Sequence, residues 1–456
     1  MFSGWTSSQT SKSTAKDYGD KGAIFMAHDF IPLRHNYYAL YVGNNTYFVF
    51  HSFNGEPFYL AEEDFQLLQN DELIIENIEY NDSVKEICIQ KTDQYISNYH
   101  CPYVLDFIIS ETCNLGCHMC FHSTSLSHCD VRKQKSELSM ELALKWLNYY
   151  IDLVRKNDLD IYSFHFGAAE PFIYKQQLWE IVKRIYQKAT DKPVELFINT
   201  NLTLLEDKDV ELISKYGIRV AVGVDGLFEI NDKIRYYKHN GKGTFNVIIR
   251  NIKKLIDANV QVGVNITLTD RNFNLINPVE IVRYFYDLGI KHLLIDSDMV
   301  THISYTSKDI VNMYMEVLKE GERLGMEING SWRTPYDMLV FENDYIPKSF
   351  CASQLGKNLA ITPSGGLSFC TYSSQILAKD CLENDINVTY NQFIDKMKNL
   401  MKKILPGKVE ECEGCPIEGM CLGGCQLAHE TNGKNNFMCD IYLESTAALI
   451  NYYYSK

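Results

Sequence analysis

Strand-length apolar runs alternate with helix-like segments six times between residues 103 and 298. Each run leads into a stretch with apolar residues at helical spacing, such as "SMELALKWLNYYIDLV" or "FNVIIRNIKKLIDA". Strands that alternate with helices build a parallel sheet, because each helix carries the chain back to the start of the next strand. The pattern therefore predicts an α/β fold, a partial, TIM-like (β/α)6 barrel. The six runs are 103–110, 161–166, 194–200, 218–225, 260–269 and 291–298.

The segments on either side of this barrel differ from it in composition. Residues 1–22 are rich in Ser, Thr, Lys and Gly, which predicts a flexible tail. Residues 23–100 contain short alternating apolar runs around glycine turns and then a helix-like stretch, which predicts a small α+β domain. The barrel is expected over 101–325. In 326–456, glycines and cysteines replace the long apolar runs, which predicts a separate metal-stabilised extension.

Charge and hydropathy exclude two classes of partner. The chain of 456 residues has a net charge of -14, whereas a nucleic-acid partner calls for a basic face. It contains no run of about 18 uncharged apolar residues, the length of a membrane span, and its polar start lacks the apolar core of a signal peptide. We therefore expect a cytoplasmic protein with no membrane or nucleic-acid partner. In a reducing cytosol the 14 cysteines would not form a disulfide framework, and their clustering indicates metal.

Polar residues collect directly after the six apolar runs. In a barrel of parallel strands the working residues lie at the carboxyl ends of the strands, around one mouth. The sequence places there three cysteines, then "GAAEP", "NTN" and "GVDG", then Thr267 and Thr269, and finally Asp296 and Asp298. Asp296 and Asp298 are the candidate proton acceptors, although an aspartate at a strand end is more often a turn or cap residue.

The first polar segment, "CNLGCHMC", carries Cys113, Cys117 and Cys120. Iron-sulfur clusters are normally held by four thiolates, so a loop that offers three leaves one iron open. An open coordination position is what a metal needs to bind a substrate or cofactor. The alternative is a zinc site whose further ligand is one of Cys129, His118, His122 and His128.

The same segment resembles the C-x3-C-x2-C signature of the radical S-adenosylmethionine (radical SAM) enzymes, which also follows their first barrel strand. The resemblance covers about residues 103–325. It implies a 4Fe-4S cluster on the three cysteines, with a free iron that binds the amino and carboxylate groups of SAM. It also implies that SAM is cleaved to a 5'-deoxyadenosyl radical that abstracts a hydrogen atom, while the protein supplies position and excludes water.

Three further segments resemble SAM-binding segments of that family. "FHFGAAEPF" is similar to the Gly-Gly-Glu-Pro segment, which assigns Glu170 to the methionine ammonium. "INTNLTLL" is similar to the Thr-Asn-Gly segment near the ribose, which assigns Thr200 and Asn201 to SAM. "VGVDGLFEINDKIR" is similar to the Ser-x-Asp-Gly segment, and Asp225 and Arg235 match it, the arginine as a ligand of the methionine carboxylate.

Four residues depart from those family segments. Ala168 and Ala169 replace two glycines, Leu202 replaces a third glycine, and Gly223 replaces the serine. If the two positions of "GAAEP" need a positive φ, alanine is strained there. These departures keep open an alternative from another class, a non-catalytic, metal-stabilised peptide-binding protein with a degraded SAM site.

The C-terminal cysteines follow the spacing C-x13-G-x4-C, a gap, C-x2-C-x5-C-x3-C, a gap, and C. This spacing resembles the SPASM extension of radical SAM enzymes that modify peptides and proteins. The resemblance implies two auxiliary 4Fe-4S clusters, so three clusters in all. A pair of zinc knuckles is the alternative. The resemblance assigns one complete cluster to Cys412, Cys415, Cys421 and Cys439, and the other cluster to Cys351, Cys370 and Cys425.

The second of these auxiliary clusters lacks a fourth cysteine shortly before Cys351. Either its iron is open, or Cys381 or a ligand other than cysteine completes it. An open iron is able to bind a substrate thiolate, whereas a closed cluster only relays electrons.

Taken together, the resemblance implies a radical SAM/SPASM peptide maturase. Such an enzyme abstracts hydrogen from a ribosomally made precursor peptide and installs an intramolecular C-C, C-O or thioether link. Its expected partners are that peptide and an electron donor, a reductase, flavodoxin or ferredoxin. The alternative enzyme is a formylglycine-forming sulfatase maturase, which generally lacks so long an N-terminal region.

The N-terminal domain contributes to this prediction. Residues 34–88 loosely resemble the winged-helix elements that recognise leader peptides, and a sheet edge there would bind an extended peptide. The alternative is a packing domain that shields the barrel.

Overall fold

The computed structural model describes residues 29–53, 55–70, 83–120, 137–299, 303–340, 349–373, 375–380, 382–428 and 436–456. The predicted tail at 1–22 lies outside them, as do Cys129, Cys381, His122 and His128. No helix among the described residues is long and apolar enough to cross a membrane.

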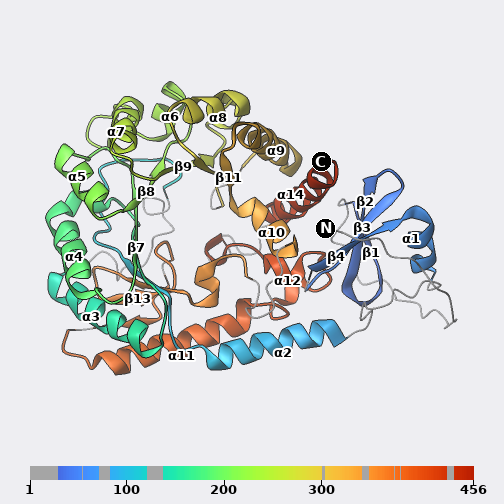
Figure 1. Cartoon of the computed structure of the whole chain (residues 1–456), viewed down its shortest axis with the longest axis horizontal. Helices are drawn as coiled ribbons and strands as arrows, with labels where there is room; N and C mark the ends of the chain where they lie inside the picture. The colour runs from blue at the N-terminus through green and yellow to red at the C-terminus, as the bar shows by residue number, and fades with distance from the viewer. Residues whose placement is uncertain are drawn as a thin grey trace.

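Six neighbouring parallel strands form the centre of the larger sheet. They lie in chain order, and each coincides with one of the six predicted apolar runs, so the predicted α/β fold with a parallel sheet is confirmed. The sheet is curved and open, consistent with a partial barrel (Figure 1). The strands are β5 (Val104–Phe107), β6 (Tyr162–Phe166), β7 (Val194–Thr200), β8 (Arg219–Gly223), β9 (Val262–Leu268) and β10 (His292–Ser297).

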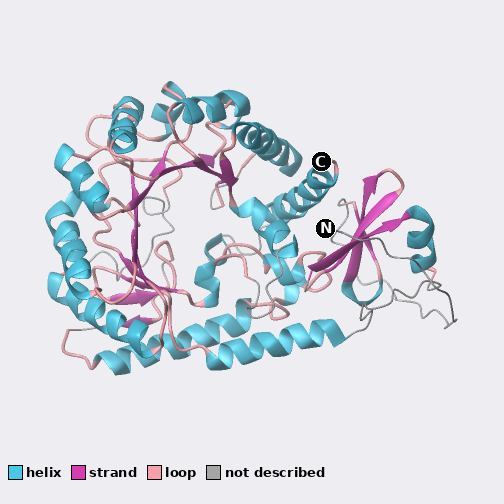
Figure 2. Cartoon of the chain, in the orientation of Figure 1, coloured by secondary structure: helices cyan, strands magenta, loops and turns pink. Residues whose placement is uncertain are grey.

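Helices cover the outer, convex face of this sheet (Figure 2). Local sequence sets their ends: Ser139 caps the first helix by accepting a hydrogen bond from the Leu142 N–H, and Gly325 ends the last one in a left-handed conformation. Their apolar faces pack on the sheet, as Tyr150 does against the ring of Phe164. The helices are α3 (Met140–Lys156), α4 (Lys175–Lys188), α5 (Asp207–Lys215), α6 (Glu229–Ile234), α7 (Phe245–Asp257), α8 (Pro278–Asp287) and α9 (Ser307–Leu324).

Residues after 325 continue the sheet at both of its edges. The strand β11 (Glu327–Asn329) pairs in parallel with β10, and β12 (Asn358–Ile361) pairs in parallel with β5. Two short antiparallel strands, β13 (Gly366–Ser368) and β14 (Ala378–Lys379), follow β12. The other elements of this part are α10 (Thr334–Val340), α11 (Ile386–Ile404), α12 (Glu418–Cys421) and α14 (Asn436–Tyr454), with short 3-10 turns that include Ser331–Arg333.

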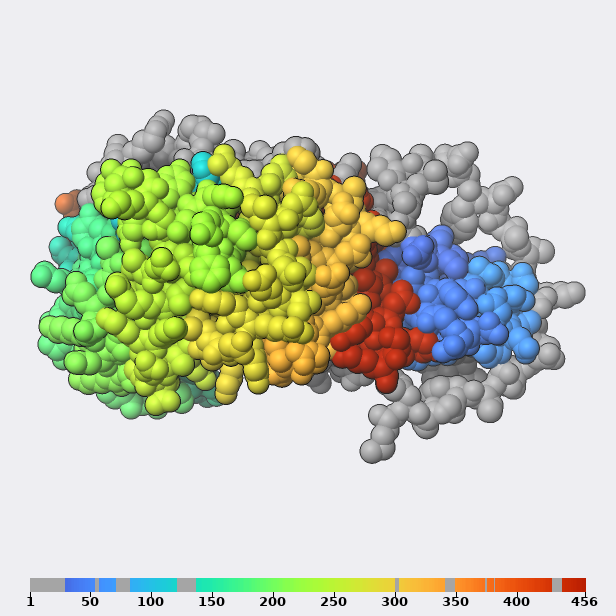
Figure 3. All heavy atoms as spheres, turned by 90° about the horizontal axis from the view of Figure 1, so that it is seen from above, coloured from blue at the N-terminus to red at the C-terminus, as the bar shows by residue number. Residues whose placement is uncertain are grey.

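The N-terminal part is an antiparallel four-stranded sheet followed by two helices. Its elements are β1 (Phe30–Pro32), β2 (Tyr37–Gly43), β3 (Thr46–His51), β4 (Gly55–Ala61), α1 (Glu62–Gln69) and α2 (Ser83–Asn98). The sheet lies against the C-terminal helix α14, which separates it from the barrel (Figure 3). The helix α2 runs beside α11 (Figure 1).

This N-terminal sheet is bonded directly to the last cysteine-rich loop. The Tyr38 hydroxyl donates to the Gly414 carbonyl at 2.7 Å, and the Gly419 N–H donates to the Ser52 carbonyl at 2.9 Å. A Cβ on Gly419 would lie 2.6 Å from the Phe53 Cα, so glycine is needed for this close approach. The two parts of the chain are thus in contact at the loop that carries Cys412, Cys415 and Cys421.

Candidate functional site

The loop that carries Cys113, Cys117 and Cys120 follows β5 and is held by the chain after α6. The Gly116 N–H donates to the Tyr236 carbonyl at 2.9 Å, and Leu115 and Tyr237 form an isolated antiparallel bridge. Backbone pairing therefore fixes a loop that has no helix or strand of its own.

The three thiols of this loop lie close enough to act on one another. Burial raises the pKa of Cys117 to about 12; Arg235 lowers it, and the charges of Asp225, Cys120 and Cys113 raise it. A raised pKa means that burial disfavours the thiolate form, which is the form that binds iron. Binding to the positively charged iron of a cluster would offset this cost. Arg235 stands next to the same thiols, which brings the predicted SAM-binding arginine to the cysteine loop.

Glu170 follows β6 and is fully buried. Its Oε1 accepts hydrogen bonds from the Phe172 N–H at 3.0 Å and the Thr200 hydroxyl at 2.8 Å, and its Oε2 accepts one from the Asn201 N–H at 2.7 Å. Burial raises its pKa to about 7, although these hydrogen bonds and the charge of Lys175 lower it. An ammonium group that reaches this carboxyl would stabilise its charged form.

Asn201 joins this carboxyl to the cysteine loop. Its side-chain N–H group donates to Asn114 Oδ1 at 2.9 Å and lies 3.6 Å from the Cys113 sulfur. Asn114 in turn donates to the Thr203 hydroxyl at 2.8 Å. The predicted residues Glu170, Thr200 and Asn201 are therefore brought together with Cys113 at the ends of β5, β6 and β7.

Asp225 and Arg235 form the second half of the predicted SAM site. The Arg235 Nε donates to Asp225 Oδ2 at 2.6 Å, and the Thr267 N–H donates to Asp225 Oδ1 at 2.8 Å. The Asn272 side chain donates to the carbonyls of Asp225 and Thr267 at 2.9 and 2.8 Å. These contacts fix the arginine at the ends of β8 and β9.

The departures from the family segments have a structural explanation. Ala168 and Ala169 have φ values of 61° and 32°, and Leu202 has a φ of 60°, so all three keep the left-handed backbone that glycine favours. Each carries strain of order 1 kcal/mol. At Gly223 the reason is space, because a Cβ there would lie 2.4–2.6 Å from the Cζ and the two terminal nitrogens of the Arg235 guanidinium. The missing serine side chain makes room for the arginine.

Gly223→Ala is expected to displace Arg235 and weaken SAM binding about tenfold, or about 1.4 kcal/mol. The matched control is Gly263→Ala on the neighbouring strand, because its Cβ would meet nothing closer than 3.7 Å. Anaerobic calorimetry of both variants with SAM measures the effect. Equal affinities in the two variants would contradict a role for the space at Gly223.

The remaining predicted residues at the mouth are held by local contacts. Thr269 donates from its N–H and its hydroxyl to Asn272 Oδ1 at 2.7 and 3.0 Å. Asp296 Oδ1 accepts from the N–H and the hydroxyl of Ser331, both at 2.6 Å, and burial raises the pKa of Asp296 to about 6. Asp298 is buried and its charge reaches Asp225. The two aspartates therefore lie at the end of β10, and Asp296 holds a turn of the extension.

The structure also groups the seven C-terminal cysteines that it describes, into four and three. Cys412, Cys415, Cys421 and Cys439 line one small cavity beside α12 and α14. Burial raises the pKa of Cys421 well above its usual range, and the other three thiols raise it further. The four thiols come from elements separated by up to 27 positions along the sequence, and α14 brings the last of them to the other three.

The second group comprises Cys351, Cys370 and Cys425. Burial raises the pKa of Cys370 to about 12, and the charges of Cys351 and Cys425 raise it further. The Gln354 side chain donates to the Gly424 carbonyl at 2.9 Å, which links the segment after Cys351 to the one before Cys425. Cys381, a candidate fourth ligand, lies outside the described residues.

The residue types in these thiol groups suit iron-sulfur clusters, which are normally held by Cys thiolates. A 4Fe-4S cube is larger than a single metal ion, and its thiolates stand around its corners. His118, an alternative zinc ligand, has its Nε2 2.6 Å from the Arg271 guanidinium, which disfavours a cation there.

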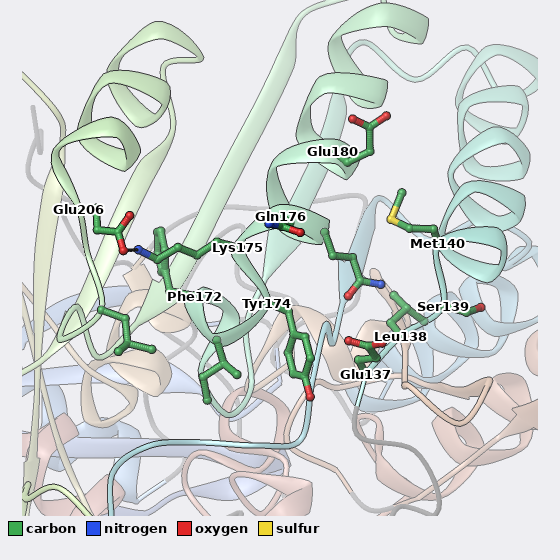
Figure 4. A pocket seen from close by; sticks show the side chains of 13 residues that line it. Glu137, Leu138, Ser139, Met140, Phe172, Tyr174, Lys175, Gln176, Glu180 and Glu206 are labelled. Atoms are coloured by element: carbon green, nitrogen blue, oxygen red, sulfur yellow. Dashed lines mark ion pairs between the residues drawn. The ribbon is translucent and has the colours of Figure 1, made fainter.

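An open hollow lies near the predicted site but contains none of its residues (Figure 4). It lies between the start of α3 and the segment from Phe172 to Glu180, and Lys175 crosses it to pair with Glu206 at 2.9 Å. Lys175 pairs with Asp209 as well, at 2.8 Å. The ion pairs identify a structural contact between α4 and α5.

The prediction from sequence missed two asparagines at the site. Asn114 bridges the cysteine loop and Asn201, and Asn272 ties β8 to β9. Asn114 lies inside "CNLGC", between two of the predicted cluster cysteines, and this position in the sequence indicates that it belongs to the site. Asn272 lies in an ordinary loop sequence, and only its fold position reveals it.

Comparison with known proteins identifies the domain that carries this site. Residues 107–284 match the family model described as the Radical SAM superfamily. The chain is 22% identical over 362 residues to the radical SAM cyclopropyl synthase TigE of Paramaledivibacter caminithermalis, an alignment that covers 74% of this chain and 72% of TigE. The chain is thus an enzyme with a radical SAM domain, and the non-catalytic alternative is set aside.

Two solved structures share the fold. The structure of anSMEcpe with bound AdoMet and the Cp18Cys peptide has a TM-score of 0.59 at 15% identity, over 77% of this chain and 99% of that one. Streptococcus suis SuiB bound to the precursor peptide SuiA has a TM-score of 0.55 at 15% identity, over 89% of this chain and 99% of that one. The part of this chain that matches SuiB is longer than residues 101–456, which hold the barrel and the extension. The match therefore includes some residues before 101.

Proposed function

We propose that this radical SAM enzyme is a cytoplasmic SPASM-type peptide maturase that installs an intramolecular link in a ribosomally made precursor peptide. The observation that carries the proposal is the grouping of ten thiols into sets of three, three and four, with Glu170 and Arg235 beside the first set. A chain that only bound peptides would need none of this arrangement.

The proposal assigns one 4Fe-4S cluster to each thiol group. When bound, the cluster on Cys113, Cys117 and Cys120 supplies an electron to SAM, and the auxiliary clusters take up an electron from the substrate. Glu170 holds the methionine ammonium, Arg235 holds its carboxylate, and Thr200 and Asn201 position the ribose side. The buried Asp225 orients Arg235 through their 2.6 Å contact.

Asp296 and Asp298 remain part of the proposal as acid–base groups on the β10 side of the barrel. A carboxyl with a pKa of about 6 exchanges protons readily near neutral pH, and Asp296 has such a pKa because the surrounding protein desolvates its carboxyl. Its Oδ1 accepts two hydrogen bonds from Ser331, so Oδ2 is the oxygen that would exchange the proton.

The substrate class is supported by the relatives. SuiB was solved with a precursor peptide, and its likeness extends into the N-terminal part of this chain. We propose that this part recognises the leader of the precursor, and that its bonds to the Gly414 and Gly419 segment link recognition to an auxiliary cluster site. A cyclopropyl ring is closed by a carbon-carbon bond, so the name of TigE favours that link over C-O or thioether. An external reductase, flavodoxin or ferredoxin supplies the electron.

Incubating reconstituted enzyme anaerobically with SAM, a reductant and the small peptides encoded beside its gene tests this function. We expect 5'-deoxyadenosine, methionine and a peptide lighter by two hydrogens per link. Cys113→Ala is the control and is expected to yield none of these products. An unchanged peptide mass despite SAM cleavage would contradict cross-linking of those peptides.

The same experiment separates the sulfatase-maturase alternative. Formylglycine formation from serine also removes two hydrogens, so mass alone does not distinguish the two reactions. An aminooxy reagent condenses with the aldehyde of formylglycine to an oxime, with loss of water, and leaves a C-C, C-O or thioether link unchanged. A product that gains the mass of the reagent less one water would overturn the proposal in favour of the sulfatase-maturase activity.

A further inference from the structure

His165 is a polar residue on the inner face of the barrel. Along β6, Tyr162, Phe164 and Phe166 are fully buried, and Phe164 contacts Tyr150 of the outer helix α3. Successive side chains of a strand point to opposite faces, so His165 points to the inner, concave side. Its side chain keeps an exposed fraction of 18%, unlike its buried neighbours.

Asp106 holds the His165 ring from the neighbouring strand. The two residues are direct partners in the β5–β6 register, and His165 Nδ1 lies 2.6 Å from Asp106 Oδ1. Asp106 is 1% exposed, and its Oδ2 accepts a hydrogen bond from the Asn358 side chain of β12 at 2.8 Å. Both carboxylate oxygens are thus engaged, and Nδ1 is the nitrogen that faces the carboxylate.

The opposite ring nitrogen, Nε2, points toward the mouth of the barrel. A Cβ on Gly167 would lie 2.4 Å from the His165 Cε1 and 2.8 Å from its Nε2, so this edge of the ring lies over Gly167. Gly167 begins the "GAAEP" segment, which carries Glu170. Within the part of the chain that the structure describes, no hydrogen bond engages Nε2.

The pair lies between the cysteine loop and the extension. Asn199 on the inner face of β7 donates to the Tyr372 hydroxyl at 3.3 Å. The charges of Cys370, Asp106 and Cys120 all act on that hydroxyl, so it lies near the Asp106–His165 pair and near cysteines of two thiol groups. A substrate that lies between the SAM site and the thiol group that includes Cys370 would therefore contact the His165 side chain on β6.

We infer that His165, oriented by Asp106, accepts the proton released when the new bond forms in the substrate. A carboxylate on one imidazole nitrogen that leaves the other nitrogen toward the substrate is the arrangement of a general base. This inference deepens the proposed function and rests on it. A plain structural pair between strands would affect folding but not the fate of a substrate radical.

The inferred step balances in atoms and electrons. One substrate C–H bond breaks, and its hydrogen atom passes to the 5'-deoxyadenosyl radical. The new bond then forms between the resulting carbon radical and a second substrate atom, whose bond to hydrogen breaks. The proton of that bond goes to His165 Nε2, and the remaining electron would be taken up by an auxiliary iron-sulfur cluster held by one of the C-terminal thiol groups.

His165→Gln is expected to lower the rate of linked-peptide formation about 100-fold, the contribution of a general base. Formation of 5'-deoxyadenosine is expected to stay within about twofold of the wild type, so its ratio to linked peptide rises steeply. The measurement is the yield of both products from the same anaerobic reaction. Asp106→Asn is expected to act in the same direction with a smaller loss.

The matched control is His292→Gln. His292 forms a similar pair with Glu327 at 2.8 Å, on β10 and β11 of the same sheet, but both side chains are about half exposed. It is expected to leave both yields unchanged. In His165→Ala, added imidazole is expected to restore part of the linked peptide, which a structural role would not allow.

Two results would overturn the inference alone: a His165→Gln variant that links the peptide at a rate within threefold of the wild type, or one in which 5'-deoxyadenosine falls in parallel with the product. If the wild-type enzyme cleaves SAM but links no peptide, the proposed function fails, and the inference fails with it. The wild-type reaction thus separates the two failures.

Discussion

Replacing Cys421 together with Cys425 is expected to remove about eight iron atoms per chain, twice the loss from either replacement alone. The two cysteines are neighbours in the sequence, but the structure places Cys421 with Cys412, Cys415 and Cys439, and Cys425 with Cys351 and Cys370. Loss of one thiolate is expected to empty its cluster, because each cluster depends on few protein ligands.

The contrasting double variant lies within one group. Cys412→Ala combined with Cys439→Ala is expected to remove only about four irons, the same as either change alone. Two replacements within one cluster do not add their iron losses, because the first already empties that cluster. Replacements in two separate clusters do add. Cys113→Ala is expected to remove about four irons as well and to abolish SAM cleavage completely, because its cluster is the one proposed to hold SAM.

Iron content after anaerobic reconstitution and the electron paramagnetic resonance of the reduced protein measure these losses. Cys101→Ala serves as the control, because Cys101 is also a buried thiol but donates to its neighbour's carbonyl and belongs to none of the three thiol groups. A loss of only about four irons in the Cys421 and Cys425 double variant would show that both belong to one cluster and would refute the grouping.

Glu170→Gln is expected to weaken SAM binding about 100-fold, or about 3 kcal/mol. The carboxyl is fully buried and is the proposed partner of the methionine ammonium. Its pKa of about 7 also gives wild-type binding a pH dependence, because the protonated carboxyl has no charge for the ammonium. Below pH 7 the wild-type affinity is expected to fall about tenfold per pH unit, and the variant is expected to lack this dependence.

The same residue links pH to the stability of the enzyme without SAM. Burial raises the Glu170 pKa in the folded state from its usual value of 4.5 to about 7, so the folded protein holds a proton that the unfolded chain has released. The free energy of unfolding from this group is therefore greatest below pH 4.5 and falls as the pH rises through 7, by up to about 3 kcal/mol. Glu170→Gln removes this dependence.

Urea unfolding of both proteins between pH 5 and pH 8 measures the difference. The variant is expected to gain stability relative to the wild type as the pH rises, whatever its absolute stability. Glu180→Gln is the control, since Glu180 lies nearby on α4 and is 37% exposed in a surface pair with Arg184. Parallel stability curves for Glu170→Gln and the wild type would contradict the raised pKa.

The sequence alone determined those features that depend on local spacing. Apolar runs of strand length, separated by helical periodicity, were enough to place all six parallel strands within about three residues of their observed ends. The placement of polar segments after these strands also brought Glu170, Thr200, Asn201, Asp225 and Arg235 to one mouth. Topology alone makes the carboxyl ends of parallel strands neighbours.

Only the tertiary structure decided what depends on register and on distant packing. No local pattern indicates that Asp106 stands opposite His165, because a shift of one residue between the strands would turn one of them to the other face. The space at Gly223 has meaning only once Arg235 fills it, and the backbone at Ala168 and Ala169 stays left-handed against the preference of alanine. The surrounding fold imposes these conformations, since packing energies outweigh local propensities of about 1 kcal/mol.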